Sequence, residues 1–228
     1  MEITNGADIK RDGNFKMLIY GKPGCGKTST VNMLQGKTLL LDIDGTSQVL
    51  SGNPNVDVVS FEADDPHKFM LEFYGYAKAN DYNNVVIDNI SYYQKLWLIE
   101  KGKKSKSNMP EWKDYAVFDN HITEVIQAFK ELNSNLILTA WESTRKISDE
   151  TGMQTYNQFF PDLREKAINA VMGTLPVVAR IVNRTDPETG EVKRGAILQE
   201  SLEVYAKNQL DDRKACKLEE LFNFEPCN

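Results

Sequence analysis

Short apolar runs alternate, along most of the chain, with longer stretches in which apolar side chains recur at helical spacing. The apolar runs are rich in Val, Ile and Leu, which is typical of strands buried on both faces of a parallel sheet. Predicted strands cover 17–20, 37–45, 56–61, 84–89 and 136–141, and predicted helices cover 28–34, 66–79, 90–100, 110–132 and 161–172. This alternation predicts an α/β fold with a mainly parallel sheet and helices on both faces.

The C-terminal part of the chain changes to strand-like patterns. Predicted strands at 177–184 and 192–198 flank a turn sequence at 186–191, and another strand is predicted at 202–207. We therefore expect the region 177–208 to form a C-terminal β-hairpin.

Three polar segments lack clear periodicity. They are an N-terminal arm (1–14), a lysine-rich stretch (101–108) and a polar stretch (142–160), and the last two are predicted to be mobile loops. No internal repeat is visible and the length suits one domain, so 1–228 is predicted to be a single domain.

Composition narrows the range of partners. A formal net charge of -6 argues against general attraction to nucleic acid, so any such binding must come from local basic segments. No apolar run approaches the length of a membrane span and the N-terminus lacks a signal-like apolar core, so we expect a cytoplasmic protein without a membrane partner. The three cysteines are widely spaced and odd in number, which predicts free thiols.

Candidate chemistry begins where the predicted strand 17–20 ends. The sequence GKPGCGKTS matches the pattern G-x-x-x-x-G-K-[ST], whose glycines let the backbone approach an anion and whose N–H groups favour phosphate at a helix start. Lys27 supplies a mobile charge for the outer phosphates, and Thr28 supplies a hydroxyl ligand for Mg²⁺. The pattern predicts a site for ATP and Mg²⁺ made of Gly21, Lys22, Pro23, Gly24, Cys25, Gly26, Lys27, Thr28 and Ser29.

An ATPase also needs a carboxylate near the metal and a group that activates water. Asp88 ends a buried strand, at the edge where open α/β sheets bind ligands, and is the second predicted metal ligand. Asn89 follows it where many ATPases have a glutamate, so the activating group must lie elsewhere.

Two acids close the neighbouring strand. Asp42 and Asp44 are two residues apart and would share a strand face, and Asp44, nearer the strand end, is the preferred catalytic acid. Glu62, after the next strand, is the rival. Thr139 and Glu142, at the end of the last core strand, are candidate sensors of the γ-phosphate.

The combination of GKPGCGKTST, LLLDIDGTS, VVIDNIS, LILTAWES and VYAKNQLDDR resembles the phage P-loop nucleotide-binding proteins. These are a RecA-like, core-only ATPase group that includes single-strand annealing proteins. The resemblance implies a RecA-like P-loop ATPase fold and supports Asp44 as the catalytic carboxylate. It also implies that Lys207, or alternatively Arg213, reaches the γ-phosphate of an adjacent subunit. RecA has a second lysine where this chain has Gln209, and the sensor glutamine of that family is missing here.

A finger acting in trans implies a head-to-tail homo-oligomer, either a ring or a filament. By the same resemblance, the segments 101–108 and 142–160 are the DNA-binding loops. Aromatic candidates for base stacking are Trp112, Tyr156, Phe159 and Phe160, and basic candidates for phosphate contacts are Lys101, Lys103, Lys104, Lys106, Arg145 and Lys146.

The function that this resemblance favours is an Mg²⁺-dependent ATPase that binds single-stranded DNA and assists phage recombination or strand annealing. Two other classes share the phosphate loop. One is an AAA-type nucleotide switch or loader that acts through protein partners, and the other is a small-molecule phosphotransferase.

Overall fold

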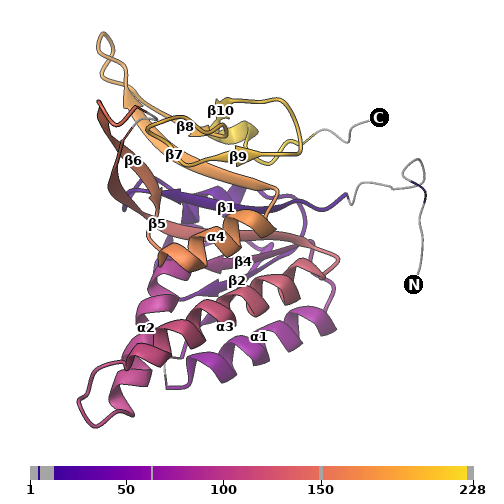
Figure 1. Ribbon diagram of the computed structural model, residues 1–228. Helices are drawn as coiled ribbons and strands as arrows, with labels where there is room; N and C mark the ends of the chain where they lie inside the picture. The colour runs from indigo at the N-terminus through magenta and orange to yellow at the C-terminus, as the bar shows by residue number, and fades with distance from the viewer. Residues whose placement is uncertain (1–4, 6–12, 63, 149–150, 225–228) are drawn as a thin grey trace.

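The computed structural model describes residues 5, 13–62, 64–148 and 151–224, whose strands form one ten-stranded sheet (Figure 1). The strand order is β10-β8-β7-β1-β5-β4-β2-β3, with β6 paired to β5 and β9 paired to β7. The strands are β1 Lys16–Gly21, β2 Thr38–Asp42, β3 Val56–Ser60, β4 Asn84–Asp88, β5 Asn135–Ser148, β6 Thr155–Pro161, β7 Val177–Thr185, β8 Val192–Ile197, β9 Lys207–Asn208 and β10 Ala215–Lys217.

The centre of the sheet is parallel. Strands β7, β1, β5, β4, β2 and β3 all run in the same direction, whereas β6, β8, β9 and β10 pair antiparallel to their neighbours. The carboxyl ends of the parallel strands therefore meet at one edge of the sheet, which we call the carboxyl edge, opposite the amino edge. Loops that follow these strands are brought together at the carboxyl edge.

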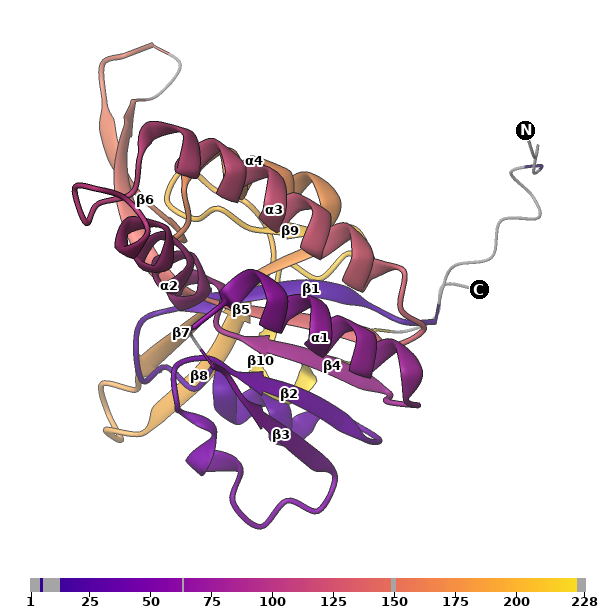
Figure 2. The same cartoon turned by 90° about the horizontal axis from the view of Figure 1, so that it is seen from below.

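Four α-helices cover one face of the sheet, as the second view shows (Figure 2). They are α1 Pro66–Ala79, α2 Ile90–Lys103, α3 Trp112–Lys130 and α4 Glu165–Thr174. The other face packs against short 3₁₀ helices, namely η2 Thr28–Met33, η3 Ser47–Leu50 and η4 Leu218–Glu220. Helices thus cover both faces as predicted, but the second layer is much thinner.

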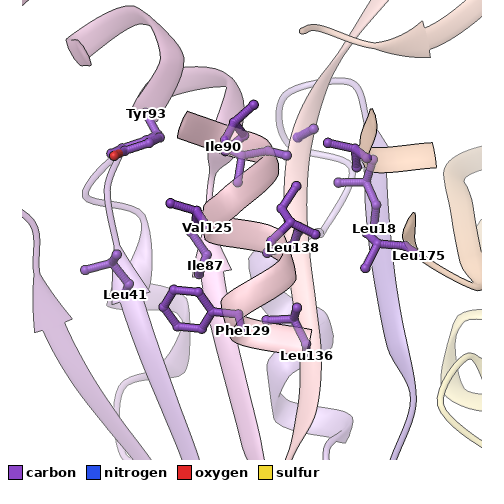
Figure 3. Close-up of a cluster of buried hydrophobic side chains, with 14 of the residues drawn as sticks. Leu18, Leu41, Ile87, Ile90, Tyr93, Val125, Phe129, Leu136, Leu138 and Leu175 are labelled. Atoms are coloured by element: carbon purple, nitrogen blue, oxygen red, sulfur yellow. The ribbon is translucent and has the colours of Figure 1, made fainter. Parts of the chain in front are cut away.

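Alternate residues of the central strands enter the two cores, because successive side chains of a strand point to opposite faces. Leu18, Leu41, Ile87 and Leu138 lie on the face covered by α1 to α4, where Phe129 of α3 packs among them (Figure 3). Their neighbours Met17, Ile19, Leu40, Val86 and Ile137 lie in the opposite core. This double burial explains why the strands appear in the sequence as continuous apolar runs.

The predicted C-terminal β-hairpin is confirmed as β7 and β8. Asp186 closes its turn, because its carboxylate accepts hydrogen bonds from the N–H groups of Glu188 and Thr189 at 3.0 and 3.3 Å. The strand predicted at 202–207 is wrong for most of its length, since only Lys207 belongs to a strand, the short β9. Strand β10 was not predicted.

The segment 142–160 is not a loop, contrary to prediction. Strand β5 continues to Ser148 and pairs antiparallel with β6, so most of the segment forms a second hairpin. Arg145 Nε donates to Gln158 Oε1 at 3.0 Å across this hairpin. Both faces of the outer hairpin are partly exposed, so the sequence carries no apolar alternation that would reveal it.

The lysine-rich stretch 101–108 is also partly regular. Helix α2 continues through Lys103, so Lys101 and Lys103 are helical, and turns follow from residue 104. The segment after the phosphate loop is a 3₁₀ helix rather than an α-helix. The arm 1–14 lies outside the described residues except for positions 5, 13 and 14. Among the helices of the described part, none is long and apolar enough to cross a membrane.

Candidate nucleotide-binding site

The phosphate loop follows β1 at the carboxyl edge of the sheet. Gly24 and Gly26 adopt φ values of 75° and 100°, which side chains with a Cβ rarely allow. Among the residues that the structure describes, the N–H groups of Gly24, Gly26 and Lys27 donate to no protein acceptor. Unpaired donors that converge beside a helix start fit a phosphate anion.

Lys27 is buried in the loop, and its ammonium group is held by the loop itself. Nζ donates to the carbonyl oxygens of Gly21 at 3.0 Å and Lys22 at 3.1 Å. These two carbonyls lie where the loop begins, so the amine is already beside the N–H groups that suit a phosphate. Exchange of a carbonyl for a phosphate oxygen would strengthen the hydrogen bond, because both partners would then be charged.

Asp88 connects the loop to strands β4 and β5. Thr28 Oγ1 donates to Asp88 Oδ2 at 2.6 Å, and Thr139 Oγ1 donates to Asp88 Oδ1. Burial raises the pKa of the Asp88 carboxyl group, while the hydrogen bonds from Thr139 and Thr28 act in the opposite direction. Strand β5 lies between β1 and β4, which places Thr139 between the loop and the acid.

The oxygen atoms of Thr28 and Asp88 fit Mg²⁺. This ion prefers oxygen ligands and is commonly bound by one or two protein groups together with substrate phosphates. Thr28 and Asp88 would hold it beside the phosphate loop. The sequence predicted this pair, but it did not reveal that Thr139 binds the acid rather than lying apart as an independent sensor candidate.

The two acids after β2 have different environments. Asp42 is buried, and its carboxylate accepts hydrogen bonds from the N–H groups of Gly45, Thr46 and Ser47 at 2.9, 3.0 and 3.2 Å. The chain therefore turns at Asp42, and the prediction that Asp44 shares its strand face is wrong. Asp42 stabilises this turn and has little capacity left for a ligand.

Asp44 is partly exposed and faces the other site residues. Its Oδ2 accepts a hydrogen bond from Asn89 Nδ2 at 2.5 Å, and its Oδ1 accepts one from Thr46 Oγ1 at 2.7 Å. Thr46 Oγ1 also lies 3.1 Å from Thr28 Oγ1. Glu62 follows the edge strand β3 and is exposed, one strand farther from the loop. These contacts favour Asp44 over both rivals.

Asn89 and Thr46 are site residues that sequence reasoning missed. Asn89 Oδ1 accepts a hydrogen bond from the Tyr92 N–H at 2.7 Å and so caps α2, while its amide nitrogen binds Asp44. The signal was an asparagine directly before a predicted helix, which is a favoured N-cap. Its significance was overlooked because the position was considered only as the absence of a glutamate.

Glu142 lies just beyond the end of β1 in the sheet register and is engaged by an arginine. Arg180 Nε of β7 donates to Glu142 Oε2 at 2.7 Å, and both side chains are largely buried. Contact between Glu142 and a γ-phosphate would require this ion pair to open.

Lys207 lies away from the phosphate loop of its own chain. Strand β9 pairs with the first residues of β7, towards the amino edge, and Lys207 Nζ donates to the Met172 carbonyl at 2.8 Å. Arg213, the alternative finger, binds Asp211 at 2.7 Å and donates to the Glu220 carbonyl at 2.6 Å. Neither cation completes the site from within the same chain.

The basic candidates divide by their contacts. Lys101 Nζ lies 4.7 Å from the centre of the Trp97 ring, and Lys103 and Lys104 pair with Glu100 at 3.7 and 2.9 Å. Arg145 lies over the Phe160 ring at 5.2 Å. Within the described part of the chain, Lys106 and Lys146 make no ion pair.

The aromatic candidates also differ in accessibility. Trp112 is 90% exposed at the start of α3, beside the lysine-rich stretch. Phe159 is packed under the Arg180 guanidinium at 3.6 Å, and the Tyr156 hydroxyl donates to Gln154. Trp112 is thus the most accessible of the predicted stacking residues.

A mostly parallel sheet, an N–H-lined phosphate loop and a Thr–Asp pair at the carboxyl edge define a P-loop NTPase. The AAA domain family model matches residues 13–210, which is most of the chain, so the protein belongs to this family and contains a nucleotide-binding ATPase domain. No curated protein matches the sequence.

Proposed function

We propose that this protein is an Mg²⁺-dependent ATPase that binds single-stranded DNA and assists recombination or strand annealing in phage DNA replication. The observation that carries the ATPase part is the contact of Thr28 and Thr139 with Asp88 beside a loop of unpaired N–H groups. That geometry provides an anion site and a metal-ligand pair at adjoining positions.

Each residue has a role in this proposal. Lys27 binds the outer phosphates, Thr28 and Asp88 hold Mg²⁺, and Asp44, held by Asn89 and Thr46, orients the attacking water. When bound, Mg²⁺ neutralises charge that develops on the phosphate oxygens. Because the protein groups mainly position and stabilise charge, loss of one group should lower turnover without abolishing the fold.

DNA binding is supported by where the basic elements lie. The β5–β6 hairpin, with Arg145 and Lys146, and the α2–α3 connection, with Lys104 and Lys106, extend on the same side of the sheet in both views (Figures 1 and 2). The phosphate loop lies at this carboxyl edge too. A strand of DNA along these elements would lie near the nucleotide, and Trp112 would provide a stacking surface.

Lys207 fits a head-to-tail assembly because of its distance from its own loop. A residue towards the amino edge meets a phosphate loop at the carboxyl edge only when subunits stack in the same direction. Contact with a neighbour's γ-phosphate would require Lys207 to leave the Met172 carbonyl. Whether the assembly is a ring or a filament follows from the rotation between subunits.

The decisive experiment is ATP hydrolysis measured with and without single-stranded DNA. Stimulation by DNA supports the proposal. Phosphate transfer to a small acceptor would instead support a phosphotransferase, and hydrolysis that does not respond to DNA would support an AAA-type switch acting through partners. The Lys27→Ala variant serves as the background, because it removes the charge that binds the outer phosphates.

The DNA surface can be tested separately with matched charge changes. Lys104→Gln with Lys106→Gln should weaken single-strand binding and reduce the salt slope by roughly 0.7 per lost phosphate contact. Lys37→Gln with Lys78→Gln changes the net charge equally at the opposite edge and should leave binding unchanged. Equal effects of the two pairs would show that only net charge matters.

Trp112→Ala should weaken DNA binding about tenfold through loss of base stacking. Tyr76→Ala removes another exposed aromatic ring, on α1, and is the control. A loss of affinity in both variants, or in neither, would remove Trp112 from the proposed interface.

A further inference from the structure

The β7–β8 hairpin passes beside the phosphate loop. Strand β7 runs parallel to β1 as far as the pair Tyr20 and Arg180, and β1 then ends at Gly21. Strand β7 continues to Thr185 and returns through β8, so the outer half of the hairpin extends beyond the sheet (Figures 1 and 2). A Cβ built on Gly21 would lie 2.9 Å from the Ile181 carbonyl oxygen, so the two segments are in direct contact.

Arg194 of β8 points from this hairpin towards the loop. A Cβ built on Gly26 would lie 3.4 Å from Arg194 Nη1 and 3.7 Å from its Cζ. Arg194 is two residues before Ala196, which is buried in the same core as Cys25 and Val31 of the loop region. Alternate residues of a strand share a face, so the strand direction also predicts this orientation.

The contacts of Arg194 differ from those of the cations around it. Lys193 pairs with Asp186 at 3.0 Å, and Arg180 pairs with Glu142 at 2.7 Å. Across the described residues, Arg194 has no carboxylate partner and no hydrogen bond, although its side chain lies beside a turn of the phosphate loop. A guanidinium group without an anion, next to unpaired N–H donors, suits a phosphate.

We propose that Arg194 binds the nucleotide from the same chain, at the α- and β-phosphates. Thr28 and Asp88 lie on the flank of the loop that faces β4, so Mg²⁺ and the γ-phosphate belong to that flank. Arg194 approaches from the opposite flank, on the side of β7 and β8. It therefore acts on the phosphates that ATP and ADP share. This inference rests on the proposed nucleotide site.

The test is the affinity of Arg194→Ala for ADP and for a non-hydrolysable ATP analogue, measured by titration calorimetry. Both affinities should fall by the same factor, about 10- to 100-fold, as expected for loss of a charge-assisted hydrogen bond. Arg194→Lys should recover part of the loss, because a lysine keeps the charge but cannot bind in a bidentate manner. Arg194 is exposed, so the variant should keep its thermal transition and remain testable.

Lys193→Ala is the matched control, since it removes a neighbouring charge from the same hairpin and should change affinity less than about twofold. A selective loss for the ATP analogue would overturn the assignment to the α- and β-phosphates. Unchanged affinity of Arg194→Ala beside lost affinity of Lys27→Ala would overturn the role of Arg194 alone. Unchanged affinity of Lys27→Ala would instead overturn the nucleotide site on which the inference rests.

Discussion

Lys16 and Lys27 lie at opposite ends of β1 and have similar surroundings by simple measures. Their exposed fractions are 5% and 7%. Each ammonium group donates to two backbone carbonyls, Lys16 to those of Leu132 and Ser134 and Lys27 to those of Gly21 and Lys22. Burial and hydrogen-bond number therefore do not distinguish a structural lysine from a functional one.

The neighbouring groups make the distinction. Near Lys16, at the amino edge, polar groups pair with one another: Asn135 Nδ2 donates to Asn84 Oδ1 at 2.8 Å, and Asn84 Nδ2 donates to the Gln35 carbonyl at 2.8 Å. Near Lys27, N–H donors of the loop have no protein acceptor in the described structure. Unfilled donors around a cation indicate a ligand, whereas a closed network indicates structural stabilisation.

The largest expected effect separates the two lysines directly. Lys27→Ala should abolish ATP turnover while changing the free energy of unfolding by less than about 1 kcal/mol, because its hydrogen bonds are replaceable by water. Lys16→Met should lower the free energy of unfolding by about 2 kcal/mol, because it leaves buried carbonyls unpaired. Its turnover per folded molecule should be unchanged. Denaturant unfolding and ATPase assays check both, and a reversed pattern would contradict the comparison.

Asp88→Asn should reduce Mg²⁺-dependent turnover by at least about a hundredfold, because it removes the charged group at the metal position. Nucleotide binding without Mg²⁺ should persist, and calorimetry with ADP, with and without Mg²⁺, measures the difference. Equal loss of affinity in both conditions would show that Asp88 does not act through the metal.

The raised pKa of Asp88 adds a pH signature to this variant. A carboxyl group whose pKa is higher in the folded state keeps its proton where the unfolded chain has lost it. Without Mg²⁺, the wild type should therefore lose stability relative to Asp88→Asn as pH rises above the ordinary aspartate pKa of about 3.9. Thermal unfolding of both proteins from acid to neutral pH tests this sign.

Thr139→Val should lower Mg²⁺ affinity and turnover about tenfold, the usual cost of losing a group that orients a metal ligand. The hydroxyl of Thr139 donates to Asp88, and valine removes it with little change in volume. Thr139→Ser keeps the hydroxyl and should keep most of the activity. If serine and valine behave alike, the hydrogen bond is not the cause.

Lys207→Met should have the smallest effect on an isolated subunit, a loss of about 1 kcal/mol in the free energy of unfolding from the hydrogen bond to Met172. If Lys207 acts on a neighbour, turnover should fall only at protein concentrations at which subunits assemble. Lys214→Met is an exposed charge control. Equal turnover of Lys207→Met and wild type at every concentration would remove the trans role.

Local sequence patterns determined the central elements of this protein. The apolar runs of β1, β2, β4 and β5 reflect burial on both faces, and the phosphate loop is defined by glycines, a lysine and a hydroxyl that any such loop requires. The position of Asp88 at a strand end was sufficient to predict its pairing with Thr28, because parallel strands end at a common edge.

Tertiary structure alone decided which polar side chains meet. Asp42 and Asp44 were equivalent by spacing, but three N–H groups of one turn occupy Asp42 and leave Asp44 to face Asn89. Arg194 is distant from Gly26 in the chain, and only the antiparallel return of β8 brings them together. Periodicity records which face of an element is buried, whereas register and the length of a hairpin, which no local pattern encodes, determine what that element touches.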